Sequence, residues 1–154
     1  MNIFQFEPTK MAEWRQLVIE GQQKSGFQLT ETIENYVVIT LDAHTTNANL
    51  SSSVIAIDFL KNIHIQSTRN MQTLRTVGDQ CLILAGLFPD RAKRKNVSAD
   101  YFKNLGENAY YVLSFAHVPA KLDRTLFYQL FENFSDLINV LQAMRLYTRQ
   151  DVFH

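Results

Sequence analysis

Apolar residues recur at helical spacing along most of the chain. In the stretch LTETIENYVVITLDAH, the positions i, i+3, i+4 and i+8 are occupied by Ile33, Tyr36, Val37 and Leu41. This spacing places side chains on one face of a helix, and Thr30 stands where an N-cap is expected. The β-branched run 37–40 would suit a strand by propensity alone, but a strand needs a partner and none follows nearby. We therefore predict a helix here, buried on more than one side because Val38 and Ile39 lie off the stripe.

Further stretches carry the same periodicity and predict helices over 9–24, 53–63, 68–88, 98–116 and 120–147. Ordinary helix signals mark several of their ends. Gly26 ends the first stretch, Pro89 ends the one over 68–88, and Ser98 caps the next. The last stretch is either one long helix or two helices broken near Ser135.

The helix that begins at Ser98 shows an apolar stripe that predicts its buried face. Val97 and Phe102 occupy the two positions of a hydrophobic staple around its start. The predicted stripe comprises Tyr101, Leu105, Ala109, Val112 and Leu113, with Gly106 beside it. Because Gly78, Gly86 and Gly106 cost helix stability, they predict close contacts between helix backbones or a bend.

No strand pair, repeat or low-complexity tract interrupts this pattern. The chain has 154 residues, of which 46% are hydrophobic, and it contains only five Gly and three Pro. That length is enough to bury one sizeable core. We predict an all-α fold, a single-domain bundle of five to seven helices that spans residues 1–154.

Charge and composition narrow the range of functions. Fifteen basic and fifteen acidic residues give a formal net charge of zero, so the whole molecule has no attraction to nucleic acid or to an anionic membrane. Cys81 is the only cysteine, and the longest apolar run, 81–88, is far shorter than a membrane span. The four histidines are widely spaced, and phosphate-loop and nucleophile-elbow motifs are absent. We expect a cytoplasmic protein without cofactor or metal, and we assign no catalytic residue.

The sequence RAKRK at 91–95 places four positive side chains in five positions, namely Arg91, Lys93, Arg94 and Lys95. Such a run is typical of a solvated turn, and it is also typical of a surface that contacts an acidic partner. Since no spacing of catalytic residues appears elsewhere, our leading hypothesis is a non-enzymatic interaction module. It would use this basic segment to bind an acidic protein or a second copy of the chain. A third and less favoured hypothesis is sequence-neutral binding of nucleic acid, which the neutral net charge and the absence of a known binding motif argue against.

Asp79 lies among apolar residues, where a carboxylate is costly unless it is paired. We expect a basic partner, either Arg75 one turn earlier or Arg91 or Arg94 from the following turn, and this ion pair would fix the turn on the helix. The alternative hypothesis for function is a small-ligand binder or enzyme with a pocket between the helices over 68–88 and 98–116. That pocket would be lined by Asp79, Tyr101 and Tyr110.

Residues 77–113 read VGDQCLILAGLFPDRAKRKNVSADYFKNLGENAYYVL. A Gly-Asp, an apolar run, Gly-Leu-Phe-Pro, spaced arginines, Val-Ser, Asp-Tyr-Phe and Gly-x-x-Ala-Tyr follow one another in this stretch. This order resembles a family of uncharacterised proteobacterial all-helical proteins, and the likeness is weaker outside the stretch. The resemblance implies a helical domain and a bacterial, cytoplasmic source. It implies no activity, so no functional residue follows from it.

Overall fold

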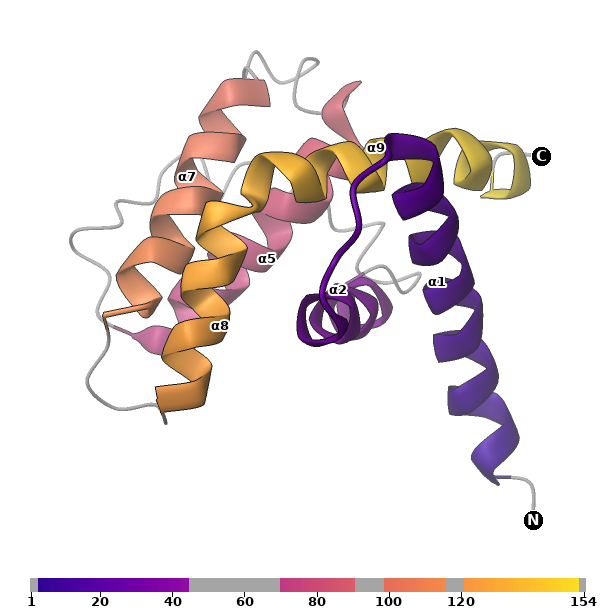
Figure 1. The fold of residues 1–154 in the computed structure, drawn as a ribbon, viewed down its shortest axis with the longest axis horizontal. Coiled ribbons are helices and arrows are strands. Elements are labelled where there is room, and N and C mark those ends of the chain that lie inside the picture. The colour runs from indigo at the N-terminus through magenta and orange to yellow at the C-terminus, as the bar shows by residue number, and fades with distance from the viewer. Residues whose placement is uncertain (1–2, 45–69, 91–98, 116–120, 153–154) are drawn as a thin grey trace.

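The computed structural model describes residues 3–44, 70–90, 99–115 and 121–152. This part of the chain forms helices and contains no strand (Figure 1). The helices are α1 (Ile3–Ser25), α2 (Glu31–His44), α5 (Met71–Leu87), α7 (Ala99–Leu113), α8 (Lys121–Glu132) and α9 (Phe134–Val152). The predicted all-α bundle is confirmed, while the helix predicted over 53–63 lies outside the described residues.

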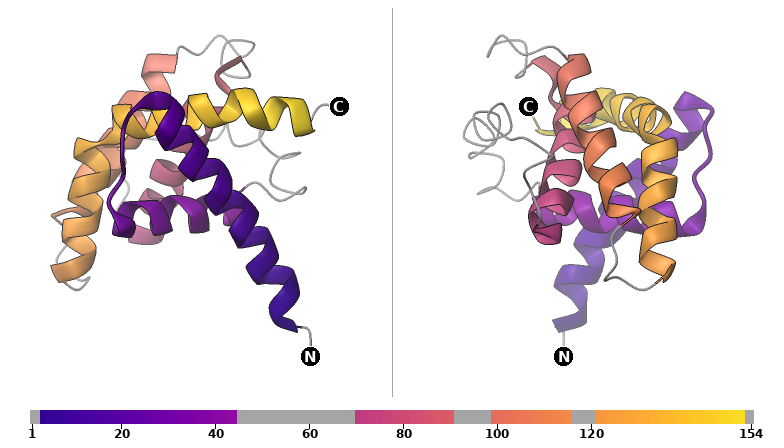
Figure 2. Two further views of the ribbon diagram at one scale, coloured as in Figure 1. Left: turned by 45° about the vertical axis from the view of Figure 1, so that its right-hand side comes forward. Right: turned by 90° about the vertical axis from the view of Figure 1, so that its left-hand side faces the viewer.

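α5 lies at the centre of the bundle. It packs most extensively against α7 and also against α9, and α8 packs against α7. Seen from the side, α5, α7 and α8 stand next to one another (Figure 2). α1 packs along α9 and against α2, and α2 in turn touches α5 and α8. Four helices that are far apart in the sequence, α2, α5, α7 and α8, therefore meet around one interior region.

The sequence of α5 explains its central position. The side-chain oxygen of Asn70 caps the helix by accepting from the backbone N–H groups of Gln72 and Thr73, at 2.8 and 3.3 Å. Every residue from Cys81 to Leu87 is buried, so this end of the helix has no polar face and must be covered all round. The helix ends two residues before Pro89, in agreement with the prediction.

Glycines allow the neighbouring helices to approach closely. A Cβ atom at Gly78 would lie 2.6 Å from the ring of Tyr110, and one at Gly106 would lie 2.5 Å from the ring of Phe134. Gly86 is in similarly close contact with α9. Since a Cβ atom does not fit at these distances, a larger residue would force the facing side chain or helix away. Close contacts at the three glycines are thus found, but they join each glycine to side chains of a neighbouring helix and not to its backbone.

The buried face of α7 differs from the predicted one. Tyr101 and Val112 are 36% and 38% exposed. The buried stripe instead comprises Phe102, Gly106, Ala109, Tyr110 and Leu113. The prediction is confirmed for Ala109 and Leu113 and wrong for Tyr101 and Val112, because it placed Gly106 beside the stripe, whereas this glycine is buried on it. Ser98 and Val97, the predicted cap and staple residue, lie outside the described residues.

The last apolar stretch forms two helices, α8 and α9, which meet at Asn133. This break falls two residues before Ser135. The side chain of Asn133 donates to the carbonyl of Gln129 at 2.9 Å, and so occupies an acceptor of the last turn of α8. Phe134 then enters the core beside Gly106, and α9 runs in a new direction toward α1 (Figure 1).

α1 begins earlier in the chain than predicted. Its first residue is Ile3 rather than Thr9, because Pro8 removes a single helical hydrogen bond close to the end of a long helix. Gly26 follows the helix with φ of +77°, a conformation that favours glycine, so the predicted stop is confirmed. In the last part of α1, Gln22 donates to Glu34 of α2 at 2.7 Å, which ties the two helices together.

α2 is helical throughout, despite its β-branched run. The hydroxyl of Thr30 accepts from the backbone N–H of Ile33 at 3.3 Å, which confirms the predicted cap. Of the two apolar residues off the stripe, Val38 is fully buried and Ile39 is 53% exposed. Tertiary contacts on more than one side therefore outweigh the strand propensity of this stretch.

Candidate functional site

Asp79 lies inside the bundle, on the part of α5 where α2 and α7 meet. Its side chain is only 7% exposed. A carboxylate at such a position needs hydrogen-bond donors, because burial removes its hydration. The preceding residue, Gly78, leaves room for the ring of Tyr110 directly beside the carboxylate. Gly78 therefore provides the space for the ring of Tyr110, and Asp79 provides the acceptor for its hydroxyl.

Two tyrosine hydroxyls donate to the same oxygen of Asp79. The hydroxyl of Tyr36, from α2, and that of Tyr110, from α7, each lie 2.6 Å from Oδ1. Distances this short are typical of hydrogen bonds from a hydroxyl to a charged acceptor. The two rings meet edge to face, with centroids 6.5 Å apart. We call these three residues the tyrosine–aspartate cluster.

The cluster changes the acidity of both phenols. Burial, followed by the negative charge of Asp79 and the hydrogen bond to it, raises the pKa of Tyr36 well above its ordinary value of 10.0. Burial, Asp79 and the neighbouring Tyr36 raise the pKa of Tyr110 in the same direction. Both hydroxyls therefore keep their protons at neutral pH and act as hydrogen-bond donors, not as bases.

Arg75 is not the direct partner of Asp79 that the sequence predicted. Its Nε donates instead to the hydroxyl oxygen of Tyr36 at 3.2 Å, so this hydroxyl stands between the guanidinium and the carboxylate. The ion pair with Arg75 does not form because the carboxylate turns inward to the phenols while the guanidinium stays near the surface, and the alternative partners Arg91 and Arg94 lie outside the described residues. The direct ionic contact comes from His44, whose Nε2 lies 3.7 Å from Oδ2 and pairs with it when the imidazole is protonated.

Tyr101, which was predicted to line the same pocket as Asp79 and Tyr110, does not join this cluster. Tyr101 lies nine positions before Tyr110 on α7, which corresponds to about 13 Å along the helix and to its opposite side. Tyr101 is accordingly at the surface, where its ring contacts Phe102. Arg91, Lys93, Arg94 and Lys95, the proposed binding residues, lie outside the described part of the chain.

Sequence reasoning missed Tyr36 and His44. Tyr36 was assigned to an apolar stripe, yet a buried tyrosine hydroxyl usually finds a hydrogen-bond partner. A buried phenol and a buried acid without a local partner were therefore a pair of signals that could have been matched. Nothing in the sequence around His44 marks it, because its contact with Asp79 depends on how α2 docks on α5.

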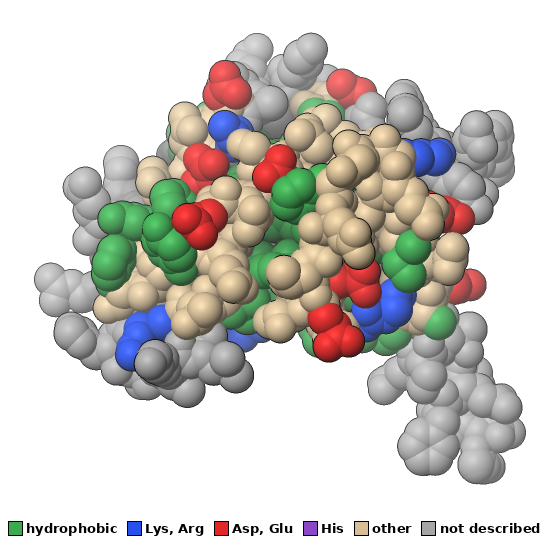
Figure 3. Space-filling model, in the orientation of Figure 1, with side chains coloured by type: hydrophobic (Ala, Val, Ile, Leu, Met, Phe, Trp, Pro, Cys, Tyr) green, Lys and Arg blue, Asp and Glu red, His purple; other side chains and the backbone are tan. Residues whose placement is uncertain are grey.

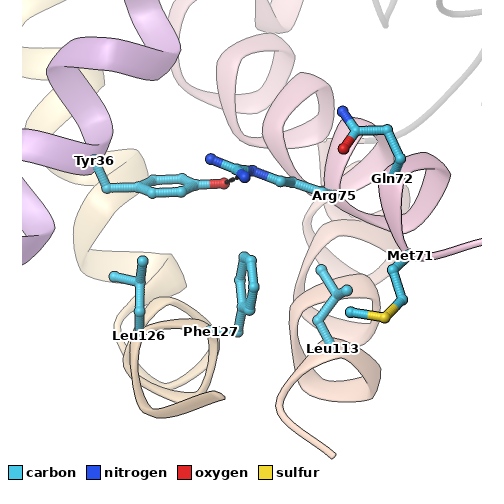
Figure 4. Close-up of a pocket in the computed structure, with 7 residues that line it drawn as sticks. All are labelled: Tyr36, Met71, Gln72, Arg75, Leu113, Leu126 and Phe127. Carbon is cyan, nitrogen blue, oxygen red and sulfur yellow. Dashed lines mark hydrogen bonds between the residues drawn. The ribbon is translucent and has the colours of Figure 1, made fainter. Parts of the chain in front are cut away.

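A pocket of about 160 Å³ opens beside the cluster. It lies where α2, α5, α7 and α8 meet, and is lined by Tyr36, Met71, Gln72, Arg75, Leu113, Leu126 and Phe127 (Figure 4). In the close-up, Tyr36 and Arg75 form one side, and the apolar side chains from α7 and α8 form the opposite side. Asp79 does not line this pocket and is reached only through the hydroxyl of Tyr36.

A second feature is a line of aromatic rings on the outer side of α7 and α8. The ring of Tyr111 lies 4.8 Å from the ring of Phe115 and 4.8 Å from that of Phe131, which in turn lies 5.8 Å from that of Tyr128. Phe115 is 61% exposed and Tyr128 is 43% exposed. Figure 3 shows hydrophobic side chains gathered over these two helices. We call these four residues the aromatic row.

Comparison with known proteins adds no assignment. No protein-family model, curated protein or solved structure matches the chain.

Two further properties of the described residues bear on function. None of the described helices is long and apolar enough to cross a membrane. Within the same residues, no group of three His, Cys, Asp or Glu side chains is placed to hold a metal ion. The features that bear on function here are the buried cluster, the small pocket that contains the cation Arg75, and the exposed aromatic row.

Proposed function

We propose that this chain is a non-enzymatic interaction module whose partner is a protein that presents apolar and acidic side chains. The aromatic row carries this proposal. Exposed tyrosine and phenylalanine rings in mutual contact are typical of the energetic centres of protein interfaces. Covering the exposed part of Phe115 alone would contribute about 1–2 kcal/mol to binding.

The tyrosine–aspartate cluster supports a role without catalysis. A general acid or base must reach a substrate. The carboxylate of Asp79 is buried, one oxygen accepts two phenol hydrogen bonds, and the other faces His44. The cluster therefore serves to hold α2, α5 and α7 together, which keeps the surface of α7 rigid.

The basic segment 91–95 supplies the argument for an acidic partner. In the sequence it stands just before α7, and the aromatic row begins at Tyr111, about 18 Å along the helix axis from the first residue of α7. An extended or helical segment of a partner can span this distance. Its acidic residues would meet the basic segment by charge complementarity, and its apolar residues would cover the row.

The test compares capture of partners from a native lysate by the wild-type chain and by three variants. The first, Phe115→Ser with Tyr128→Ser, disrupts the aromatic row. The second replaces Arg91, Lys93, Arg94 and Lys95 with Glu. The third, Ile39→Ser, is the matched control, because Ile39 is an exposed apolar residue of α2 outside the row. Mass spectrometry identifies the captured proteins, light scattering gives the oligomeric state, and circular dichroism checks folding.

The proposal requires an acidic protein in stoichiometric amount, lost from the first two variants and retained by Ile39→Ser. A set of captured proteins that is the same for all four samples would contradict it. So would the absence of any stoichiometric protein. A dimer lost only in the aromatic variant would point to a second copy of the chain instead, and bound nucleic acid would replace the protein partner altogether.

A further inference from the structure

The pocket beside Tyr36 combines one cation with an apolar wall. An apolar cavity of about 150 Å³ holds one benzene molecule. The pocket has a volume of about 160 Å³, so it is the right size for a single small ring or branched chain. Leu113 and Phe127 are buried core residues that keep this wall in place. A ligand here would be mostly apolar and would carry one polar end.

Because Arg75 lines the pocket with a positive charge, it favours a negatively charged group at the polar end of the ligand. Its Nε is engaged by Tyr36, while its two terminal nitrogens have no hydrogen-bond partner among the described residues. A guanidinium can bind a carboxylate through two parallel N–H donors, and such bonds are stronger than those between neutral groups. Gln72, one turn earlier on α5, adds an amide at the same rim (Figure 4).

The buried acid does not compete for this site. Asp79 stays behind Tyr36, and its oxygens are directed at the two phenols and at His44. Asp79 acts on the pocket in two ways: its charge interacts with that of Arg75, and it holds the hydroxyl of Tyr36, which in turn holds the guanidinium of Arg75. The cation is thus placed before any ligand arrives, which lowers the ordering cost of binding.

We propose that this pocket binds a small apolar carboxylate of about the size of benzoate. Its carboxylate would lie on Arg75, and its ring would lie against Leu113, Leu126 and Phe127. Inorganic phosphate fits this site less well, because its further oxygens would face an apolar wall and lose hydration without gaining donors. The site is independent of the aromatic row, since none of the four row residues lines the pocket.

The experiment titrates the full chain with benzoate, with its neutral isostere benzamide, and with inorganic phosphate. Binding is measured by calorimetry and located by the methyl NMR signals of Leu113 and Leu126. Arg75→Gln removes the cation, and Leu126→Trp fills the pocket. Lys10→Gln is the matched control, because it removes a surface cation that does not line the pocket.

We expect benzoate to bind about tenfold more tightly than benzamide, with shifts at both leucine methyl groups. Arg75→Gln should weaken benzoate binding about tenfold, Lys10→Gln should leave it unchanged, and Leu126→Trp should abolish it. The proposal is overturned if benzoate does not bind at millimolar concentration, or if benzamide or phosphate binds equally well. It is also overturned if Arg75→Gln has no effect. If Leu126→Trp does not fold, the comparison of Arg75→Gln with Lys10→Gln still decides the question.

Discussion

Removing the hydroxyl of Tyr110 tests the central cluster most directly. The substitution Tyr110→Phe keeps the ring, which is fully buried between Gly78, Phe127 and Phe134, and deletes one 2.6 Å hydrogen bond to Asp79. A hydrogen bond to a charged group contributes about 1.5–3 kcal/mol, and here its loss leaves a buried carboxylate with a single phenol donor. We therefore expect the free energy of unfolding to fall by about 2–3 kcal/mol. That is a large part of the 5–15 kcal/mol typical of a whole domain.

The assay is urea unfolding at neutral pH, followed by circular dichroism. Tyr111→Phe is the matched control, because it removes the same hydroxyl from the next residue of α7, which is 40% exposed, and should change the free energy by less than about 0.5 kcal/mol. In an Asp79→Asn background, Tyr110→Phe should cost only about 1 kcal/mol, since the acceptor is then neutral. Equal effects of the two tyrosine substitutions in the wild-type background would refute the assignment of a stabilising bond to Asp79.

Two further predictions follow from the same cluster. The unfolded chain releases protons from Tyr36 and Tyr110 near their ordinary pKa of 10.0, while the folded chain retains them because both pKa values are raised. The contribution of the two phenols to the free energy of unfolding should thus be fully present below about pH 10. Above that pH it should fall by about 1.4 kcal/mol per pH unit for each phenol. Urea midpoints that stay constant up to pH 11 would contradict this prediction. Gly78→Ala should lower the free energy of unfolding by about 1–3 kcal/mol despite the better helix propensity of alanine, because the new Cβ would meet a ring that its hydroxyl ties to Asp79. An unchanged or raised melting temperature for this variant would show that the ring can move.

Much of the fold follows from the sequence because apolar residues recur at helical spacing along most of the chain. Thr30, Gly26 and Pro89 mark helix ends by local chemistry, and the structure confirms all three. The rotation of α7 could not be obtained in this way. Its apolar residues cover one broad side, and the packing of Gly106 against Phe134 and Cys81 shows which part of that side is buried.

The candidate site was harder to predict than the helices. The sequence indicates that Asp79 needs partners, but those partners come from positions 43 residues earlier and 31 residues later in the chain. Local spacing favoured Arg75, which lies one turn away on the same helix. The partners of Asp79 are set by the way α2 and α7 dock on α5, and a short stretch of sequence does not indicate this docking.

Because the hydroxyls of Tyr36 and Tyr110 share one oxygen of Asp79, the three positions are coupled in evolution. Loss of Asp79 to an apolar residue would leave the hydroxyls of Tyr36 and Tyr110 without their acceptor, and loss of either tyrosine would leave the acid short of a donor. Each such replacement costs stability, and the loss is smaller once a partner has already changed. Descendants of this chain should therefore retain Asp79 together with both tyrosines more often than they retain any one of the three alone.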